Sequence, residues 1–352
     1  MDKALQWNVR GVRARQQDLS LLIKEKDPSC LCLQELKLPN NTQYNVSNLY
    51  KSYFKLPQDN VIPKGGALIA VKTTIPHHQV QLNTNLQAVA VSFNSGGLKS
   101  LCSIYLPPNE QITEDQMGEL MNQLPKPTLI LGDLNAHNPL WYDQRLDQRG
   151  EDIQKIMDTH DLIALNEDYP TFYRSFDQVT SNIDLALVTN TCATDFSWNI
   201  LDDLYGSDHY PVLISALQPS PPDYIEKYNL NKADWSKYRD QVITSKRVAE
   251  APNIDQALEH IKNTILIASN QSIPKTKVNG ARRPCLPWWN SDCKVERSKV
   301  RSAFRVMKRN PNPTTIQIYR RRLAIKVRTY RQAKQKSWRK YISGLTAKTP
   351  TS

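Results

Sequence analysis

The sequence predicts an α/β domain followed by a smaller, basic α-helical segment. Short apolar or β-branched runs alternate with amphipathic helical patterns up to about residue 218, and long helical patterns dominate after it. The charge changes at the same place. Residues 1–218 hold 17 Lys and Arg against 25 Asp and Glu, whereas residues 219–352 hold 29 against 9. This asymmetry predicts an acidic catalytic module followed by a basic segment that binds nucleic acid.

The first part alternates strand and helix patterns. Amphipathic periodicity predicts helices over residues 16–26, 113–122 and 150–159, with Thr113 as an N-cap and Asp27-Pro28 as a stop. Strands are expected where apolar or β-branched residues cluster between turn residues. These runs cover residues 4–9, 30–34, 65–71, 86–93, 100–104, 128–131, 162–165, 170–173, 182–188, 196–200 and 210–215.

Pro219, Pro221 and Pro222 mark the predicted boundary between domain 1–218 and region 219–352. Helices are expected over residues 254–269, 291–309 and 314–342. Residues 282–340 contain 19 Lys and Arg, interleaved with aromatic residues. We expect this basic tail to contact the phosphate backbone of RNA or DNA. The alternative is a solvated helical hairpin that only spaces domains.

Composition also excludes some classes. No apolar run reaches the length of about 18 residues that a transmembrane helix needs, so no membrane partner is expected. No secretory signal is visible at the start of the chain, and the cysteines are irregularly spaced. An intracellular, reducing compartment is the simplest interpretation.

The segment Thr128–Asn138 is the most informative. A buried strand is predicted to end at Gly132, and Asp133 and Asn135 then point the same way at its carboxyl end. Open α/β sheets place their chemistry at that edge. A carboxylate beside a carboxamide can hold a water or a metal-bound phosphate oxygen. The alternative is a turn, because Gly-Asp-x-Asn is good turn chemistry by itself.

Polar residues follow many of the other predicted strands. Each has a bland alternative: a helix cap, a surface carboxylate, a core ring or a turn. Their joint occurrence at strand ends is much less likely than any one of them and favours an active site. The full set is Asn8, Glu35, Tyr105, Asp133, Asn135, Asp184, Asp208 and His209.

Six short sequence motifs, in their order along the chain, resemble those of the endonuclease/exonuclease/phosphatase superfamily. They are WNVRG, LQELKL, SIYLPP, GDLNAHN, NIDLAL and GSDHYPV, and they span residues 7–212. IYLPPN, GDLNAHNPLW and RGEDIQKIMDTHDLIALN resemble, more closely, the endonuclease of non-long-terminal-repeat (non-LTR) retrotransposons of the jockey or I-factor kind. The basic tail is similar to the segment that precedes the reverse transcriptase in those elements, and no polymerase follows here, as expected of an excised module. The resemblance implies a four-layered α/β sandwich, two mixed β-sheets flanked by helices, with the site at one end.

The resemblance also implies a metal site. Glu35 would hold Mg²⁺, for which Mn²⁺ can substitute, because hard cations prefer carboxylate and phosphate oxygens. Asn8 would orient that site, and Asp208 would assist near the metal or the water. Arg10 stands where abasic-site nucleases of the superfamily usually carry an Asp. This departure weakens an abasic-repair assignment.

The remaining roles concern the phosphate. Asp133 would align or deprotonate the attacking water, and Asn135 would steady the pentavalent phosphorus. His209, positioned by Asp184, would contact the scissile phosphate, and Tyr105 would donate to a phosphate oxygen. We expect both Glu35 and His209 to lie in a hydrophilic mouth where truncation costs little packing.

Five residues are expected to contact nucleic acid. They are Arg10, Asn109, Arg174, Gln178 and Thr180. Arg174 can meet a phosphate, and the last two can contact groove edges. They belong to the polar connection between residues 173 and 182, whose equivalent in related retrotransposon endonucleases is a groove-probing hairpin. The alternative is an inert surface loop.

The predicted function is a Mg²⁺-dependent DNA endonuclease. It would nick target duplex DNA and leave a 3′-hydroxyl primer for target-primed reverse transcription. Its partners would be that DNA, the element RNA through the basic tail, and a reverse transcriptase domain, in the nucleus. Two alternatives remain: a phosphodiesterase or phosphatase of the same fold acting on another phosphoester, and a non-catalytic nucleic-acid-binding module.

Overall fold

The computed structural model describes residues 1–57, 63–94, 96–174, 178–217, 225–243, 253–278 and 286–344. The chain folds as two compact units. Met1–Ser220 and Arg283–Ser352 form the first unit, and Pro221–Arg282 form the second. The predicted boundary at residues 218 and 219 lies outside the described residues. The basic region that the sequence sets apart contributes to both units.

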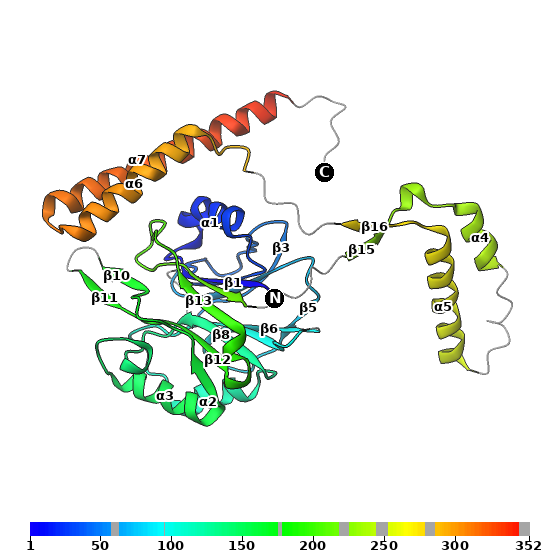
Figure 1. Cartoon of the computed structure of the whole chain (residues 1–352), viewed down its shortest axis with the longest axis horizontal. Helices are drawn as coiled ribbons and strands as arrows, with labels where there is room; N and C mark the ends of the chain where they lie inside the picture. The colour runs from blue at the N-terminus through cyan, green and yellow to red at the C-terminus, as the bar shows by residue number, and fades with distance from the viewer. Residues whose placement is uncertain are drawn as a thin grey trace. The chain divides into compact units, whose positions relative to one another are not determined.

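Two six-stranded mixed sheets build the first unit (Figure 1). One sheet has the order β13-β14-β1-β2-β4-β3, and the other has the order β5-β6-β7-β8-β12-β9. The first comprises β13 (Phe196–Ile200), β14 (Val212–Ala216), β1 (Lys3–Asn8), β2 (Cys30–Gln34), β4 (Ala67–Lys72) and β3 (Tyr50–Lys55). The second comprises β5 (His77–Val80), β6 (Gln87–Phe93), β7 (Ser100–Tyr105), β8 (Thr128–Asp133), β12 (Asp184–Thr189) and β9 (Leu162–Ala164).

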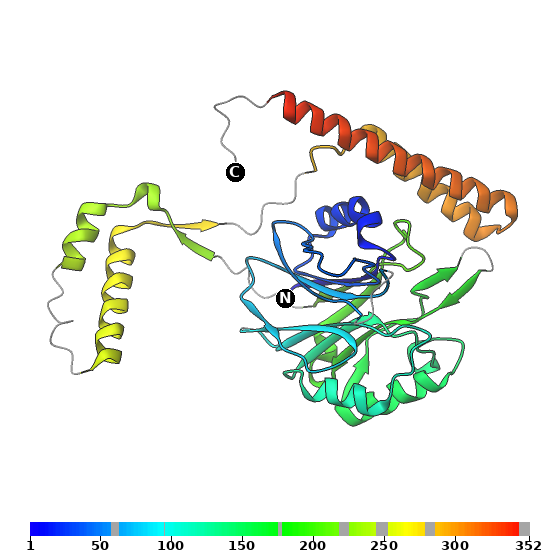
Figure 2. The same ribbon diagram turned by 180° about the vertical axis from the view of Figure 1, so that it is seen from behind.

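Helices cover the outer faces of both sheets, as both views show (Figures 1 and 2). Helix α1 (Val12–Lys26) packs on the first sheet. Helices α2 (Glu114–Asn122) and α3 (Gln148–His160) pack on the second. A third buried cluster fills the space between the sheets. The predicted fold class, a four-layered α/β sandwich, is confirmed.

The two-residue period of a strand decides which side chains reach the space between the sheets. In β1, Leu5 and Trp7 pack on the α1 side, whereas Ala4 lies in the cluster between the sheets. In β8, Leu129 and Leu131 also lie between the sheets, whereas Ile130 packs toward α2 and α3. The same alternation fixes the direction of the polar residues that end these strands.

Most predicted elements of the sandwich are present with small shifts at their ends. The Thr113 N-cap is confirmed, because its side chain accepts a hydrogen bond from the backbone of Gln116 in a capping box. Helix α1 begins at Val12, four residues before the predicted start. Strands β3 and β5 were not predicted. Their sequences, YKSYFK and HHQV, are polar and partly exposed, as expected of strands at sheet edges.

A two-stranded ribbon extends from the sandwich beside the candidate site. It pairs β10 (Phe172–Arg174) with β11 (Val179–Ser181). Short 3₁₀ turns at Pro139–Trp141 and Asn190–Asp195 complete the sandwich. Residues 175–177, between β10 and β11 in the chain, lie outside the described residues.

The first unit also contains a long helical hairpin, α6 (Ser291–Arg309) and α7 (Pro313–Ser343). Asn312 caps α7 and Pro313 occupies its first turn, as helix starts favour. The second unit holds a ribbon of β15 (Ile225–Tyr228) and β16 (Lys275–Val278), a 3₁₀ turn at Leu230–Lys232, and helices α4 (Trp235–Ile243) and α5 (Ile254–Ser272). Within the described ranges, no helix is long and apolar enough to span a membrane.

Candidate active site

Strand direction and strand period together gather the predicted polar residues at one end of the sandwich. Strands β1 and β2 are parallel, and so are β7 and β8, so their carboxyl ends lie at the same end of each sheet. Tyr105 is paired with Asp133 across β7 and β8, and Asp133 with Asp184 across β8 and β12. Asn8 ends β1 and faces these residues from the other sheet.

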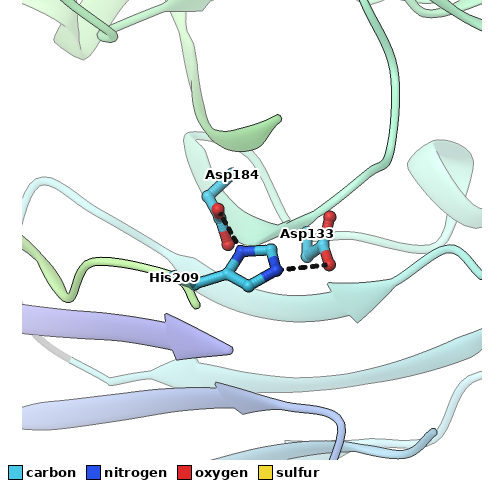
Figure 3. Close-up of side chains that lie close together, drawn as sticks. All are labelled: Asp133, Asp184 and His209. Carbon is cyan, nitrogen blue, oxygen red and sulfur yellow. Dashed lines mark hydrogen bonds and ion pairs between the residues drawn. The ribbon is translucent and has the colours of Figure 1, made fainter. Parts of the chain in front are cut away.

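The innermost group is His209 with two carboxylates, one on each side of its ring (Figure 3). Its Nδ1 lies 2.7 Å from Asp184 Oδ2, and its Nε2 lies 3.9 Å from Asp133 Oδ2. All three side chains are buried. The ring of Phe172 packs against the imidazole, with centroids 5.0 Å apart. The expectation of a histidine in a hydrophilic mouth is therefore wrong, because His209 is enclosed by the strands that carry its partners.

The carboxylates set the protonation of the histidine. Burial opposes the charged imidazole, but Asp184, Asp133 and Asp208 outweigh it and raise the pKa of His209 to about 10. Burial raises the pKa of Asp133 to about 7, with Asp184 acting in the same direction and the imidazole opposing it. Near neutral pH the site thus holds an imidazolium beside a carboxyl group that can gain or lose a proton.

Asn8 joins this group to Glu35. Its Nδ2 donates to Asp133 Oδ2 at 2.8 Å and to Glu35 Oε1 at 3.1 Å. Tyr105 donates to the same Glu35 oxygen at 3.4 Å, and Lys37 pairs with the other at 2.7 Å. Burial would raise the pKa of Glu35, but the hydrogen bonds from Lys37 and Asn8 hold it below its usual value. Glu35 is therefore ionised near neutral pH.

Tyr105 stays protonated in this setting. Burial, and then the negative charges of Glu35 and Asp133, raise the pKa of its phenol well above the usual value. A protonated phenol can donate a hydrogen bond to a phosphate oxygen. This agrees with its predicted role.

Asn135 lies on the turn after β8. Its backbone N–H donates to Asp133 Oδ1 at 3.1 Å, and its side chain donates to the carbonyl of Leu106 at 3.0 Å. Asn135, Glu35 and Arg10 have φ values of 46°, 49° and 47°. Left-handed backbone at non-glycine residues is costly and clusters at functional sites.

Asp208 and Arg10 form an outer pair at the mouth of the site. Arg10 Nη1 lies 2.5 Å from Asp208 Oδ2, and the Arg10 side chain is 55% exposed. The structure thus places Asp208 on an arginine, apart from the inner histidine group. The other residues predicted to contact nucleic acid, Asn109, Arg174, Gln178 and Thr180, are all exposed.

Two sets of residues could hold a cation. Asp133, Asp184 and His209 offer ligand-type atoms within 4.8 Å of one another. Nδ1 of His209 is already bonded to Asp184 at 2.7 Å, and all three side chains are buried. Glu35 suits one better, because it presents an ionised carboxylate with 19% of its side chain exposed. That donor chemistry fits a hard divalent ion.

Sequence reasoning missed two buried glutamines between the sheets. Gln6 Nε2 donates to Asp184 Oδ1 at 2.7 Å and to Gln34 Oε1 at 2.9 Å. Gln34 in turn donates to Ser103 Oγ at 2.9 Å. These bonds hold the carboxylate that pairs with His209. The signal was present, because a glutamine interrupts the apolar alternation in both ALQWN and CLCLQ.

Arg149 was also missed. Its guanidinium donates to the carbonyl oxygens of Leu106 at 3.3 Å, Leu134 at 3.2 Å, Pro107 at 2.9 Å and Glu110. One side chain thus ties the loop after β7 to the loop after β8. Gly150 lets the start of α3 approach the backbone at His137 closely, since a Cβ at residue 150 would lie 1.9 Å from the carbonyl oxygen of His137.

Solved structures with a similar fold define the fold class of this chain. The endonuclease domain of TRAS1, a telomere-specific non-LTR retrotransposon, matches with a TM-score of 0.52 and 23% identity, over 61% of this chain and 97% of that chain. An AP endonuclease from Archaeoglobus fulgidus matches with a TM-score of 0.51 and 16% identity, over 62% of this chain and 100% of that chain. The chain thus has the fold of the endonuclease/exonuclease/phosphatase superfamily.

Sequence relatives narrow this class. Residues 100–213 match the endonuclease–reverse transcriptase family. The probable RNA-directed DNA polymerase from transposon BS of Drosophila melanogaster is 27% identical over 236 residues, 62% of this chain and 25% of that protein. The RNA-directed DNA polymerase from mobile element jockey of the same species is 22% identical over 281 residues, 77% of this chain and 30% of that protein.

The predicted resemblance to the endonuclease domain of a jockey-like non-LTR retrotransposon is confirmed by these matches. The chain spans only 25% to 30% of the length of the curated relatives it matches.

Proposed function

We propose that this chain is a divalent-metal-dependent endonuclease that nicks duplex target DNA for a non-LTR retrotransposon. The observation that carries the proposal is the chain of hydrogen bonds that runs from Glu35 through Asn8 to Asp133, beside the Asp184–His209 pair. It supplies a metal-binding carboxylate, a base and a phosphate-binding cation in one place. Phosphodiester hydrolysis needs these three functions.

The residues divide the hydrolysis as follows. Asp133 accepts a proton from a water whose oxygen attacks phosphorus, since its pKa lies near neutral pH. The imidazolium of His209 and the phenol of Tyr105 donate to the non-bridging oxygens as negative charge develops there. The bond from phosphorus to the 3′ oxygen breaks, and that oxygen takes a proton from solvent water. The products are a 3′-hydroxyl and a 5′-phosphate.

Glu35 would hold Mg²⁺, with Mn²⁺ as a substitute. The bound ion would neutralise the charge of the phosphate and stabilise the leaving oxygen. Asn8 and Tyr105 keep the Glu35 carboxylate in place through the bonds described above. Asp208, paired with Arg10, would shape the mouth from the opposite side.

The 3′-hydroxyl would prime reverse transcription by a polymerase in the same protein. The relatives are named as RNA-directed DNA polymerases, and this chain corresponds to a part of them. We infer that the chain acts in the nucleus, on chromosomal DNA. Element RNA, or DNA beyond the nick, would bind the exposed arginines of α7.

A groove on α7 supports that last assignment. It is lined by Leu323, Ala324 and Val327 together with Arg320, Arg328 and Arg331. All three arginine side chains are exposed. Arginines beside apolar side chains suit a phosphate backbone with its sugars.

Nicking of supercoiled plasmid tests the proposed activity. The protein should convert supercoiled DNA to open circles in Mg²⁺ or Mn²⁺. EDTA should stop the conversion, and added Mg²⁺ should restore it. The nicks should be extendable by a DNA polymerase, because they end in a 3′-hydroxyl. DNA binding without metal-dependent nicking would favour a non-catalytic nucleic-acid-binding module. Hydrolysis of a small phosphoester, without nicking, would favour a phosphodiesterase or phosphatase of the same fold.

A further inference from the structure

The α6–α7 hairpin is bound to the nuclease sandwich by paired charges. Lys326 Nζ lies 2.9 Å from Asp18 Oδ1 of α1, and both side chains are less than 10% exposed, at 4% and 9%. Arg297 Nη2 donates to Glu25 Oε2 at 2.9 Å and to the Tyr205 hydroxyl at 2.8 Å. A buried charge that loses its partner is strongly destabilising, so this contact specifies one docked position.

A third ion pair joins α6 to the sandwich. Arg301 Nε donates to Asp203 Oδ2 at 3.0 Å. These contacts use Arg297, Arg301 and Lys326, three of the cations that the sequence assigns to nucleic acid. The basic tail therefore has two parts: cations that bind the sandwich and cations that stay exposed.

Apolar and aromatic side chains fill the centre of the docked surface. Tyr173 of β10 and Tyr210, which follows His209, pack with Phe304 of α6 and Tyr319 of α7 in one buried cluster. The Phe304 ring lies 5.8 Å from that of Tyr173, 6.2 Å from that of Tyr210 and 5.4 Å from that of Tyr319. Phe304 thus contacts both segments that enclose the catalytic histidine.

Those two segments are bonded to each other across the histidine. The Tyr173 N–H donates to the carbonyl of Asp208 at 2.8 Å, and the Tyr210 N–H donates to the carbonyl of Thr171 at 2.7 Å. Between these bonds, the ring of Phe172 packs on His209. The position of the imidazole thus depends on the fit between β10 and residues 208–210.

We propose that Phe304, supported by Tyr319, is a positioning residue of the nuclease that holds β10 against residues 208–210. Through this contact it fixes the orientation of His209. It also fixes the base of the β10–β11 ribbon, which bears Arg174, Gln178 and Thr180. The hairpin is then a working part of the nuclease as well as a connection to the polymerase region. The catalytic consequence rests on the proposed function.

Substitution of Phe304 in the full chain tests the inference. Phe304→Ala should lower kcat for nicking at least about tenfold with KM within about twofold, because a misplaced catalytic group affects the chemical step most. It should also change the distribution of nick sites on a long duplex. Phe304→Leu should restore most of the activity. Val306→Ala, on the same helix at a residue 53% exposed, is the matched control and should behave like the unchanged protein.

Hydrogen exchange gives a measure that does not depend on activity. In Phe304→Ala the amides of Tyr173 and Tyr210 should exchange at least about tenfold faster, while those of β1 keep their rates. Unchanged exchange at both tyrosines, or superimposable nick profiles with kcat within about twofold, would overturn the inference. If Phe304→Ala does not fold, Tyr319→Ala, which removes the ring that packs on Phe304, decides by the same two measures. If the protein without any substitution nicks no DNA, the proposed function is refuted but the role of Phe304 is not. The hydrogen-exchange result still decides whether Phe304 holds the two segments together.

Discussion

At the scale of single residues, the site depends on charges that control one another. Asp133 and His209 face each other, and each shifts the protonation of the other. Their pKa values of about 7 and about 10 are far enough apart for one group to act as a base while the other remains a cation.

The pH dependence of nicking should follow from this separation. Asp133 is a base only when ionised, above its pKa of about 7, and His209 is a cation only below its pKa of about 10. We expect kcat to rise through the first value and fall through the second, giving a bell-shaped profile. The measurement is nicking at fixed, saturating Mg²⁺ across this range. A rate that stays constant from about pH 5.5 to about pH 8.5 would contradict the role of Asp133.

Substitutions at Glu35 and His209 test the two charges at the phosphate. Glu35→Gln and His209→Asn should each lower nicking by about a hundredfold or more, since each removes a charge that stabilises the transition state. His209→Ala is a poorer choice, because the ring is buried against Phe172 and its loss leaves a cavity. His78→Asn, at an exposed residue of edge strand β5, is the matched control. Near-normal nicking by either site variant, with unchanged circular dichroism, would show that the substituted residue does not have the proposed role in catalysis.

Arg149 should matter although it lies outside the inner histidine group. Arg149→Lys keeps the charge but cannot supply several N–H groups to the loops after β7 and β8. We expect a loss of about tenfold to a hundredfold in kcat, since these loops carry Tyr105 and Asn135 to the phosphate. Lys155→Gln, also on α3 with 54% of its side chain exposed, should have no effect. Equal kcat values for the two variants would show that the loops hold their positions without Arg149.

At the scale of single elements, the β10–β11 ribbon joins a base that packs on His209 to exposed polar residues. Phe172 of β10 contacts the imidazole, whereas Arg174, Gln178 and Thr180 are exposed. A ribbon of two strands has little stability by itself. It therefore depends on the neighbours that its base packs against.

Replacement of residues 176–180 by a short Gly-Ser turn tests the ribbon. The nick pattern should change more than the total nicking, because the deleted residues contact groove edges and leave the inner site intact. Sequencing of all nicks on one long duplex measures both quantities. A Gly-Ser replacement of residues 94–97, in the β6–β7 hairpin, is the control. Identical nick profiles for the original and the shortened ribbon would leave the ribbon without a role in target selection.

At the scale of the whole molecule, charge is divided between two kinds of surface. The sandwich is acidic and the tail is basic, yet some tail cations are used within the fold. Only the exposed ones can release counterions from a bound nucleic acid.

The exposed arginines of α7 should therefore set the salt dependence of binding. Replacing Arg320, Arg328 and Arg331 with Gln should weaken binding to RNA and duplex DNA and reduce the salt slope by about 0.7 to 0.9 for each phosphate that the variant no longer neutralises. The control replaces Lys3, Lys51 and Lys99, which are exposed near the end of the sandwich opposite the site, and has the same change in charge. Binding measured from low to high salt gives the slopes. Equal slopes for the two triple variants would mean that only net charge matters.

The sequence by itself determined where the central strands lie and which polar residues stand at their ends. Apolar runs and their two-residue period define the central strands, and the polar residues at the ends of these runs identify Asn8, Tyr105 and Asp133, with Asp184 at the start of β12. These are local properties, set by which side chains are apolar and where the chain can turn. The edge strands β3 and β5 were not predicted, because a partly exposed strand needs no apolar pattern.

Only the tertiary structure decided how these parts work together. The glutamines that hold the Asp184 carboxylate and the docking of Phe304 beside Tyr173 join residues far apart in the chain. No local pattern specifies such partners. A buried charge or ring finds its neighbour only when strands and helices pack, and the same packing divides the basic tail into cations that bind the sandwich and cations that face solvent.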